Sequence, residues 1–302
     1  MTAAYKTIAE KYSIENHLQF RETSSGLMQA RLIHGSGACA ELYLYGAHIT
    51  SWKTADGKEL LFISKKSAYE KGTAIRGGIP LIFPQFGDGE LPKHGFARIN
   101  EWDMIESGVS DRGEVHVRVR LVSNPDIHEL WPHQFVAEYT VTLGESLTTS
   151  LQILNEGESP FSFTTALHTY FSVSSIERYG IEGLKGCNYI DRLASSKHDT
   201  ERAGQIRISS MVDRVYLNTP RELIMRNIDT GESVTIKKVG FKDAVVWNPW
   251  QEGARSMKDF GDEEYVSMLC IEAAHCVPAI TLAPEEFWVG VQVLHRVEGK
   301  KG

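Results

Sequence analysis

Cysteine is scarce in this chain of 302 residues, and its spacing excludes two kinds of small, cross-linked fold. The four cysteines are Cys39, Cys187, Cys270 and Cys276, and none of them forms a CxxC pair. Zinc-finger spacing is therefore absent, and nothing suggests the disulfide framework of a secreted domain. We expect four reduced thiols that behave as small, mostly buried hydrophobic side chains.

Long apolar runs and a surplus of positive charge are missing too. No stretch approaches the roughly 18 apolar residues that a membrane-spanning helix needs, and residues 1–22 lack the apolar segment of a secretory signal. Lys and Arg number 32 against 39 Asp and Glu, for a net charge of −7, which argues against a general nucleic-acid binder. These absences predict a soluble, cytoplasmic protein without membrane or nucleic-acid partners, and a monomer is the working expectation. A local basic pocket for one phosphate is still compatible with the total charge.

The sequence also lacks long amphipathic helical patterns, and short strand-like runs take their place. Residues Val115–Val122 alternate strictly between apolar and polar or charged side chains, which is typical of a half-buried strand. Phe135–Leu143 and Leu147–Leu154 are two further runs, joined by a turn that contains Gly144. Short strands at even spacing, separated by Gly, Asn and Asp, predict an all-β fold built as a large antiparallel β-sandwich. Because no linker and no repeat is visible, we expect residues 1–302 to form one domain.

The stretch Arg76–Arg98 does not resemble a packing element. It holds three of the ten prolines and five of the 26 glycines, a density that excludes a long helix and a central strand. Gly77 and Gly78 allow a positive φ or a close backbone approach to a ligand, and the apolar residues between them and Arg98 predict that parts of the loop are buried. Its arginines, lysine, histidine and glutamine supply donors for an oxygen-rich, anionic ligand. A structural loop with ordinary surface cations is the alternative.

Glu272 is the sharpest anomaly, because it lies in the otherwise apolar run Ser267–Ala274. A carboxylate there is expected to be buried or to face a pocket, and buried carboxylates are rare unless they are paired or functional. We interpret Glu272 as a general base, with an ion pair to an arginine as the structural alternative. His168 lies in an aromatic and β-branched run. It is either a core histidine bonded to a backbone carbonyl or the partner that completes an acid/base pair.

Three weaker signals accompany this pair. Asp213 either caps a turn or holds a ligand hydroxyl. Trp247 and Trp250 flank an Asn-Pro turn, where they either stack on a sugar or fill a corner of the core. His275 follows Glu272 by three residues, an offset that places the two side chains on opposite faces of a strand and argues against a metal site. We expect no metal and no other cofactor.

Taken together, several motifs occur in an order that resembles one known family. The motifs are Arg76-Gly77-Gly78-Ile79-Pro80, His94-Gly95-Phe96-Ala97-Arg98, Ala166-Leu167-His168-Thr169-Tyr170-Phe171, Val212-Asp213-Arg214-Val215-Tyr216, Val246-Trp247-Asn248-Pro249-Trp250 and Ile271-Glu272-Ala273. From about Gly46 to Val293, the chain resembles the hexose-6-phosphate mutarotases of the aldose 1-epimerase superfamily. The resemblance implies a galactose-mutarotase-like β-sandwich. It also implies interconversion of the α and β anomers of a hexose 6-phosphate, with glucose 6-phosphate the leading candidate.

The resemblance assigns the proton transfers to two residues. His168 matches the family's acid and Glu272 its base. Anomerisation removes the proton from O1 and protonates the ring oxygen, so that the ring opens, C1 rotates and the ring closes on the other face. Two proton-transfer groups are sufficient for this reaction, and each contributes about 10²–10⁴-fold.

The same resemblance assigns five residues to substrate binding. Arg76 and Arg98 match the family's substrate- and phosphate-contacting arginines, and Asp213 matches its sugar-contacting aspartate. Lys93 stands where relatives commonly have a substrate-contacting glutamine, and the change adds a positive charge near the pocket. His94 resembles a histidine that lines the site of the galactose mutarotases.

Two other functions are compatible with a large β-sandwich. One is a non-catalytic phosphosugar-binding protein, which would not need a matched acid and base such as His168 and Glu272. The other is a glycoside hydrolase, which normally needs two carboxylates that flank the scissile bond. Only Glu272 stands out in this sequence, and Asp213 is a weak second.

Overall fold

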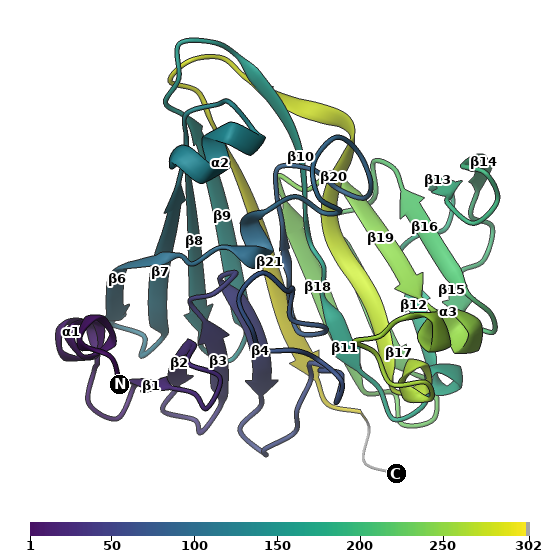
Figure 1. The fold of residues 1–302 in the computed structure, drawn as a ribbon. Helices are drawn as coiled ribbons and strands as arrows, with labels where there is room; N and C mark the ends of the chain where they lie inside the picture. The colour runs from purple at the N-terminus through teal and green to yellow at the C-terminus, as the bar shows by residue number, and fades with distance from the viewer. Residues whose placement is uncertain (300–302) are drawn as a thin grey trace.

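The computed structural model describes residues 1–299, and antiparallel strands are the main regular structure among them (Figure 1). Two large sheets face each other, and a smaller sheet adjoins them near the N-terminal helix. The predicted all-β antiparallel sandwich is confirmed. The helical segments are α1 (Ala3–Tyr12), α2 (Pro125–Leu130) and α3 (Trp250–Ser256), with 3₁₀ turns η1 (Ala97–Ile99), η2 (Ile176–Arg178) and η3 (Glu264–Ser267). Within residues 1–299, no helix is both long and apolar enough to cross a membrane.

The larger sheet has nine strands in the order β15-β12-β17-β18-β21-β9-β8-β7-β6. From β6 to β9 its bounds are β6 (Asp103–Val109), β7 (Val115–Val122), β8 (Phe135–Leu143) and β9 (Leu147–Asn155). The others are β12 (Tyr179–Glu182), β15 (Gln205–Arg207), β17 (Glu222–Asn227), β18 (Ser233–Val239) and β21 (Phe287–Val297). The run with strict alternation is β7, and each of its apolar residues up to Leu121 is buried while the polar residues between them are not. The expected hairpin is β8–β9, in which Leu143 pairs with Leu147.

The second large sheet runs in the order β14-β13-β16-β19-β20-β10-β5, with β11 paired to β20. Its strands are β5 (Leu81–Ile82), β10 (Phe161–Leu167), β11 (Tyr170–Ser172), β13 (Asn188–Asp191), β14 (Lys197–Thr200), β16 (Val212–Tyr216), β19 (Asp243–Asn248) and β20 (Met268–Leu282). The small sheet has the order β1-β2-β3-β4, with β1 (Leu18–Glu22), β2 (Met28–Ile33), β3 (Cys39–Tyr43) and β4 (His48–Lys53).

The two faces of the second sheet lie in different environments. Because side chains alternate along a strand, Ile271 of β20 joins the main hydrophobic core, whereas Glu272 points to the opposite face. Glu272 is in register with Val245 of the neighbouring strand β19, and Trp247 of β19 is in register with Asp213 of β16. Residues in register share a face, so these side chains all lie on the side of the sheet that faces away from the sandwich core.

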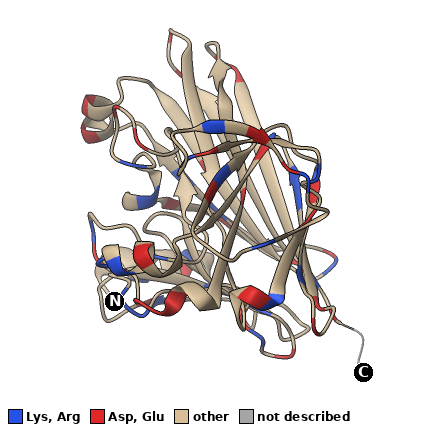
Figure 2. Cartoon of the chain, turned by 90° about the vertical axis from the view of Figure 1, so that its right-hand side faces the viewer, with Lys and Arg blue, Asp and Glu red and all other residues tan. Residues whose placement is uncertain are grey.

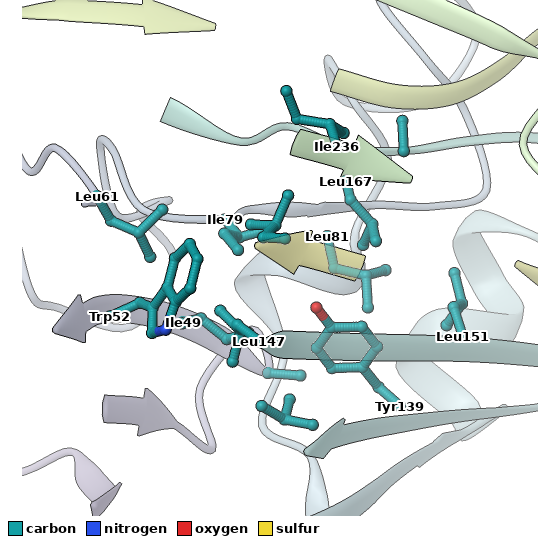
Figure 3. Close-up of a cluster of buried hydrophobic side chains, with 14 of the residues drawn as sticks. Ile49, Trp52, Leu61, Ile79, Leu81, Tyr139, Leu147, Leu151, Leu167 and Ile236 are labelled. Atoms are coloured by element: carbon teal, nitrogen blue, oxygen red, sulfur yellow. The ribbon is translucent and has the colours of Figure 1, made fainter. Parts of the chain in front are cut away.

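The sandwich core anchors the loop 76–98. Figure 3 shows Leu81 of this loop among Tyr139 and Leu151, which come from strands of the nine-stranded sheet. Ile79 and Leu81 are fully buried. The expectation that parts of the loop are buried is confirmed, and β5, the two-residue strand that the loop contributes, is at the edge of its sheet rather than in the centre.

The paired glycines at the start of this loop have positive φ angles of 114° at Gly77 and 63° at Gly78. A Cβ atom on Gly78 would lie 2.1 Å from the carbonyl oxygen of Ile49, and one on Gly77 would lie 2.3 Å from that of Phe62. The glycines are therefore required for close approach to neighbouring backbone, and this approach holds the loop against β4.

Two expectations from the sequence concern the burial of the cysteine thiols and the charges of the surface. All four thiols are free, but only Cys39 and Cys270 are buried, while Cys187 and Cys276 are partly exposed. Cys187 and Cys276 are partly buried hydrophobic side chains packed against core clusters, so the expectation of mostly buried thiols is confirmed. Basic and acidic residues are interspersed over the face drawn in Figure 2 rather than separated into one basic and one acidic side.

Candidate active site

A cavity of about 220 Å³ opens on the outer face of the second sheet. It brings together all seven residues that the sequence singled out for catalysis or binding. The lining residues are Arg76, Phe86, Lys93, His94, Arg98, His168, Arg192, Asp213, Val245, Trp247, Met257 and Glu272. Strands β16, β19 and β20 form the floor, and the loop 76–98 forms one wall.

His168 and Glu272 meet at the floor of the cavity. The Nε2 atom of His168 lies 3.3 Å from Oε1 of Glu272, and the two side chains are 9% and 1% exposed. His168 follows the end of β10, where its backbone N–H donates to the carbonyl of Pro80. Oε2 of Glu272 and Nδ1 of His168 are buried and have no hydrogen-bond partner among the described residues. These two atoms are available to the hydroxyl groups of a ligand.

Burial shifts the pKa values of this pair in opposite directions. Desolvation, followed by the nearby charge of Asp213, raises the pKa of Glu272 well above its usual range. Desolvation, followed by the charges of Arg76 and Arg98, lowers the pKa of His168 well below its usual range. Both shifts oppose a charge on either group, so the unliganded pair favours a protonated Glu272 and a neutral His168 over the ion pair.

Arg76 is held from two sides. Its Nε and Nη2 atoms each lie 3.0 Å from Oδ2 of Asp259, and its Nη1 donates to the hydroxyl of Tyr170 at 3.0 Å. The ring of Tyr170 is stacked on the imidazole of His168, with centroids 4.7 Å apart and an interplanar angle of 12°. Arg76 is therefore both a lining residue of the cavity and a neighbour of the ring that supports His168.

Arg98 differs from Arg76, because no carboxylate of residues 1–299 lies within 4.0 Å of its guanidinium. The Nη2 atom of Arg98 donates to the carbonyl oxygen of Lys93 at 2.7 Å. The Nε atom of Arg98 is buried and has no hydrogen-bond partner among the described residues. Desolvation, which dominates, lowers the pKa of Arg98 to about 10, so the side chain is still cationic at neutral pH. A half-buried cation without a carboxylate partner is suited to bind an anionic ligand.

Lys93 and His94 lie next to each other at the mouth of the cavity. The Lys93 side chain is 60% exposed, and its Nζ is 3.7 Å from Asp88. His94 is buried, and its Nδ1 accepts from the backbone N–H of Gly87 at 3.2 Å, which leaves the proton on Nε2. Desolvation, followed by the charge of His168, lowers the pKa of His94, so it is a neutral hydrogen-bond donor.

Asp213 and Arg192 form a second charged pair that lines the cavity. Asp213 lies in β16, 3.9 Å from Nε of Arg192, and burial raises the pKa of Asp213. The Arg192 guanidinium also lies over the ring of Phe86, 5.4 Å from its centroid, and 3.9 Å from Asp88. The interpretation of Asp213 as a turn cap is wrong, because the residue is within a strand.

Several structural alternatives can now be decided. Among the described residues, the ion-pair partner of Glu272 within 4.0 Å is His168 and not an arginine. Trp247 lines the cavity with its ring 5.9 Å from that of His168, whereas Trp250 packs on Tyr265 instead. His275 faces the other side of the sheet, where Nδ1 contacts the carbonyl of Gly240. The expected separation of Glu272 and His275 is confirmed.

Comparison with protein families identifies the family to which this chain belongs. Residues 28–295 match the family model "Aldose 1-epimerase". The chain belongs to the aldose 1-epimerase family. It is thus an isomerase that interconverts the anomers of a sugar, and the cavity with its His–Glu pair is the candidate active site of an aldose 1-epimerase.

The proteins to which this chain is similar support the same family assignment. A Cenchrus ciliaris protein named "Putative glucose-6-phosphate 1-epimerase" is 42% identical over 278 residues, which cover 89% of this chain and 84% of that protein. The crystal structure of "a putative mutarotase (YeaD)" from Salmonella typhimurium superposes with a TM-score of 0.87 at 26% identity, covering 95% of this chain and 96% of the other. The galactose 1-epimerase from Lactobacillus acidophilus has the same fold, with a TM-score of 0.75 at 15% identity and coverages of 95% and 100%.

The sequence did not single out three residues that bear on this epimerase site, namely Arg192, Tyr170 and Asp259. Tyr170 lies two residues after His168 within the same motif, so its place in the site could have been inferred from proximity in the chain. Arg192 and Asp259 are charged residues in polar segments, and nothing in the sequence distinguishes them from surface residues. Only the fold brings Arg192 to the cavity and Asp259 to Arg76.

Proposed function

We propose that the protein interconverts the α and β anomers of a hexose 6-phosphate, with glucose 6-phosphate as the leading substrate. The observation that carries the proposal is Arg98, a half-buried cation without a carboxylate partner among the described residues, on the wall of the cavity that holds His168 and Glu272. A neutral sugar would leave this charge unmatched, whereas a phosphate dianion matches it through charge-assisted hydrogen bonds. The name of the Cenchrus ciliaris relative supports the same substrate.

The basic wall of the cavity, formed by Arg76, Arg98 and Lys93, binds one part of the substrate, and the floor binds the other part. Arg98 binds the phosphate, with Arg76 beside it and the exposed Lys93 at the mouth. Asp213, which lies in β16, accepts hydrogen bonds from sugar hydroxyls. This arrangement fixes the ring with C1 and the ring oxygen over the His168–Glu272 pair, because binding energy from the phosphate positions the reacting atoms.

The ring opens by a concerted movement of two protons. In the working state of the pair, Glu272 is ionised and His168 is protonated, which is the tautomer of the resting pair with the same number of protons. Glu272 takes the proton from O1 while His168 donates its proton to the ring oxygen, and the C1–O5 bond breaks to give an aldehyde and a hydroxyl. Rotation about C1–C2 followed by the reverse proton transfers closes the ring as the other anomer.

The size of the cavity favours this function over hydrolysis of a glycan. At about 220 Å³ it is smaller than the roughly 300–1,000 Å³ of drug-sized sites, which suits one sugar unit. A binding protein would gain nothing from a buried carboxyl group whose proton is shared with a histidine, because burying such groups is unfavourable.

The decisive experiment measures the exchange between α- and β-glucose 6-phosphate by exchange NMR, with free glucose in parallel. The wild type should accelerate exchange of the phosphosugar well above that of free glucose. Glu272→Gln keeps the shape of the side chain and should lower kcat by about 10²–10⁴-fold with little change in KM. If the wild type accelerates the exchange of neither sugar, the protein is a binder rather than an enzyme for these substrates, and the proposal fails.

A further inference from the structure

An unbroken series of contacts connects the basic wall to the proton-transfer pair. Asp259 accepts from Arg76, and Nη1 of Arg76 donates to the hydroxyl of Tyr170 at 3.0 Å. The Tyr170 ring is stacked on His168 with centroids 4.7 Å apart, and His168 faces Glu272 at 3.3 Å. Tyr170 is 1% exposed, so water does not screen this path. One aromatic ring separates the charge on Arg76 from the proton that the pair shares.

The charges that face His168 from the loop are positive. The ionisable groups around it are Arg76, Lys93, His94 and Arg98 on the loop side, and Tyr170, Arg192, Asp213 and Glu272 on the sheet side. Asp259 already compensates Arg76 in part, whereas Arg98 has no such partner among the described residues. A positive field at this position disfavours a protonated imidazole, and it holds the shared proton on Glu272.

We propose that the phosphate of the substrate is an activator of the acid/base pair as well as a binding group. A dianion bound at Arg98 and Arg76 neutralises the positive charge that faces His168. The proton then moves from Oε1 of Glu272 to Nε2 of His168, which produces the working tautomer without any gain or loss of protons. Tyr170 is a positioning residue in this scheme, because it ties Arg76 to the ring on which His168 rests.

This inference rests on the proposed function, since it requires a phosphate at the arginines, but it goes further. If the phosphate served only to bind the substrate, a separate anion in the same place would have no effect on the turnover of a sugar that lacks it. If the phosphate activates the pair, a dianion should do so even when it is not covalently linked to the sugar. The inference can therefore be tested with the substrate supplied in two pieces.

The pieces are D-xylose, which lacks the phosphorylated C6 of glucose 6-phosphate, and phosphite dianion. Phosphite should raise kcat for xylose anomerisation in a saturable manner, by about tenfold for each pKa unit by which it shifts the proton balance of the pair. Phosphite is itself an acid/base catalyst, so the rate with Glu272→Gln at the same phosphite concentration is subtracted. Inhibition of glucose 6-phosphate exchange by phosphite, measured in parallel, reports its binding at the arginines.

Variants separate activation from binding. Arg98→Met should abolish both the inhibition and the activation by phosphite. Tyr170→Phe keeps the stacked ring but loses the acceptor for Arg76, so phosphite should still inhibit while its activation of xylose falls. Arg178→Met removes an exposed arginine that faces Asp229 and does not line the cavity, and it should respond to phosphite as the wild type does.

Two results would overturn the inference. One is phosphite that inhibits glucose 6-phosphate exchange without accelerating xylose, and the other is phosphite that does neither. In both cases, rapid exchange of glucose 6-phosphate by the same preparation would leave the proposed function intact. Failure of that exchange would instead overturn the proposed function itself.

Discussion

The Nε2 atom of His168 and the Oε1 atom of Glu272 lie 3.3 Å apart at the floor of the cavity, and burial drives their pKa values in opposite directions. Burial opposes the charged form of each group, and the one proton that the two groups share can change its position between them without exchange with solvent. An enzyme that must remove one proton and deliver another in the same step is well served by this arrangement.

The first prediction concerns the pH dependence of the rate. Because burial lowers the pKa of His168 and raises that of Glu272, the pair should keep its one proton as the pH passes the ordinary histidine pKa, and kcat should show no break there. The phosphate group titrates near pH ~6, so the profile for glucose 6-phosphate is compared with that for free glucose. A break near the ordinary histidine pKa with both sugars would contradict a shared proton.

The second prediction concerns stability. Because the pKa of Glu272 is raised on folding, the folded chain retains the proton of this carboxyl group at pH values at which the unfolded chain has released it. The folded state then binds more protons, so its stability falls as pH rises, by up to about 1.4 kcal/mol per unit. The lowered pKa of His168 acts in the opposite sense, because only the unfolded chain holds this proton as the pH approaches about 6.5 from below, so this contribution to stability grows up to about that pH.

The measurement is urea unfolding at about pH 6 and about pH 8 for the wild type and Glu272→Gln, two values on either side of the ordinary histidine pKa. The variant lacks the titrating carboxyl group, so it should gain stability relative to the wild type as the pH rises. It should also be the more stable protein at the higher pH. If both proteins lose the same stability between the two pH values, Glu272 is ionised in the folded state and the shared proton is ruled out.

How much could be predicted from the sequence depended on how strongly each residue departs from its surroundings. Glu272 is a carboxyl group in an apolar run, and a strand that must bury such a group indicates a pocket on one of its faces. Strand β7 was predicted to the residue, because strict alternation fits only a half-buried strand. Gly77 and Gly78 revealed that the backbone is constrained there but not by what, since Phe62 and Ile49 are distant in the chain.

Arg192 and Asp259 mark the limit of such inference. Each is a charged residue in a polar segment, where a solvated side chain is the ordinary outcome. Asp259 faces Arg76 across a separation of 183 residues, and no local pattern specifies such a contact. The different environments of Arg76 and Arg98 were also out of reach, because in the sequence both are simply loop arginines.

That difference leads to the third prediction, on substrate selectivity. Arg98→Met removes the cation that lacks a carboxylate partner, and it should lower kcat/KM for glucose 6-phosphate by about 10²-fold, which corresponds to the loss of one or two hydrogen bonds to a charged group. Free glucose should not be slowed, because it makes no such bond and because the loss of this charge, like its neutralisation by a phosphate, favours the protonated form of His168. Arg76→Met should impair both sugars, because Arg76 also contacts Tyr170 beneath His168. Equal losses of kcat/KM for both sugars in Arg98→Met would show that the phosphate does not bind at Arg98.

The fourth prediction concerns Arg192, which faces Asp213 in the cavity. Arg192→Met deletes the cation that faces Asp213 at 3.9 Å, which should raise the pKa of Asp213 further and weaken its hold on sugar hydroxyls. We expect KM to rise by about three- to tenfold for glucose 6-phosphate and free glucose alike, in keeping with a loosely packed ion pair. A loss confined to the phosphosugar would place the phosphate at Arg192 instead.

The last prediction concerns the loop that carries both arginines. Gly78 has a φ of 63°, and an added Cβ would lie 2.1 Å from the carbonyl oxygen of Ile49. Gly78→Ala should therefore lower the free energy of unfolding by about 3 kcal/mol or more, because it combines a strained backbone with a forced displacement of β4. Gly72 is a matched control: its φ is 86°, but a Cβ there would meet nothing within 4 Å. Gly72→Ala should cost only about 1 kcal/mol. Urea unfolding of both variants tests this directly, and equal losses would show that the close approach to Ile49 contributes nothing beyond the backbone strain.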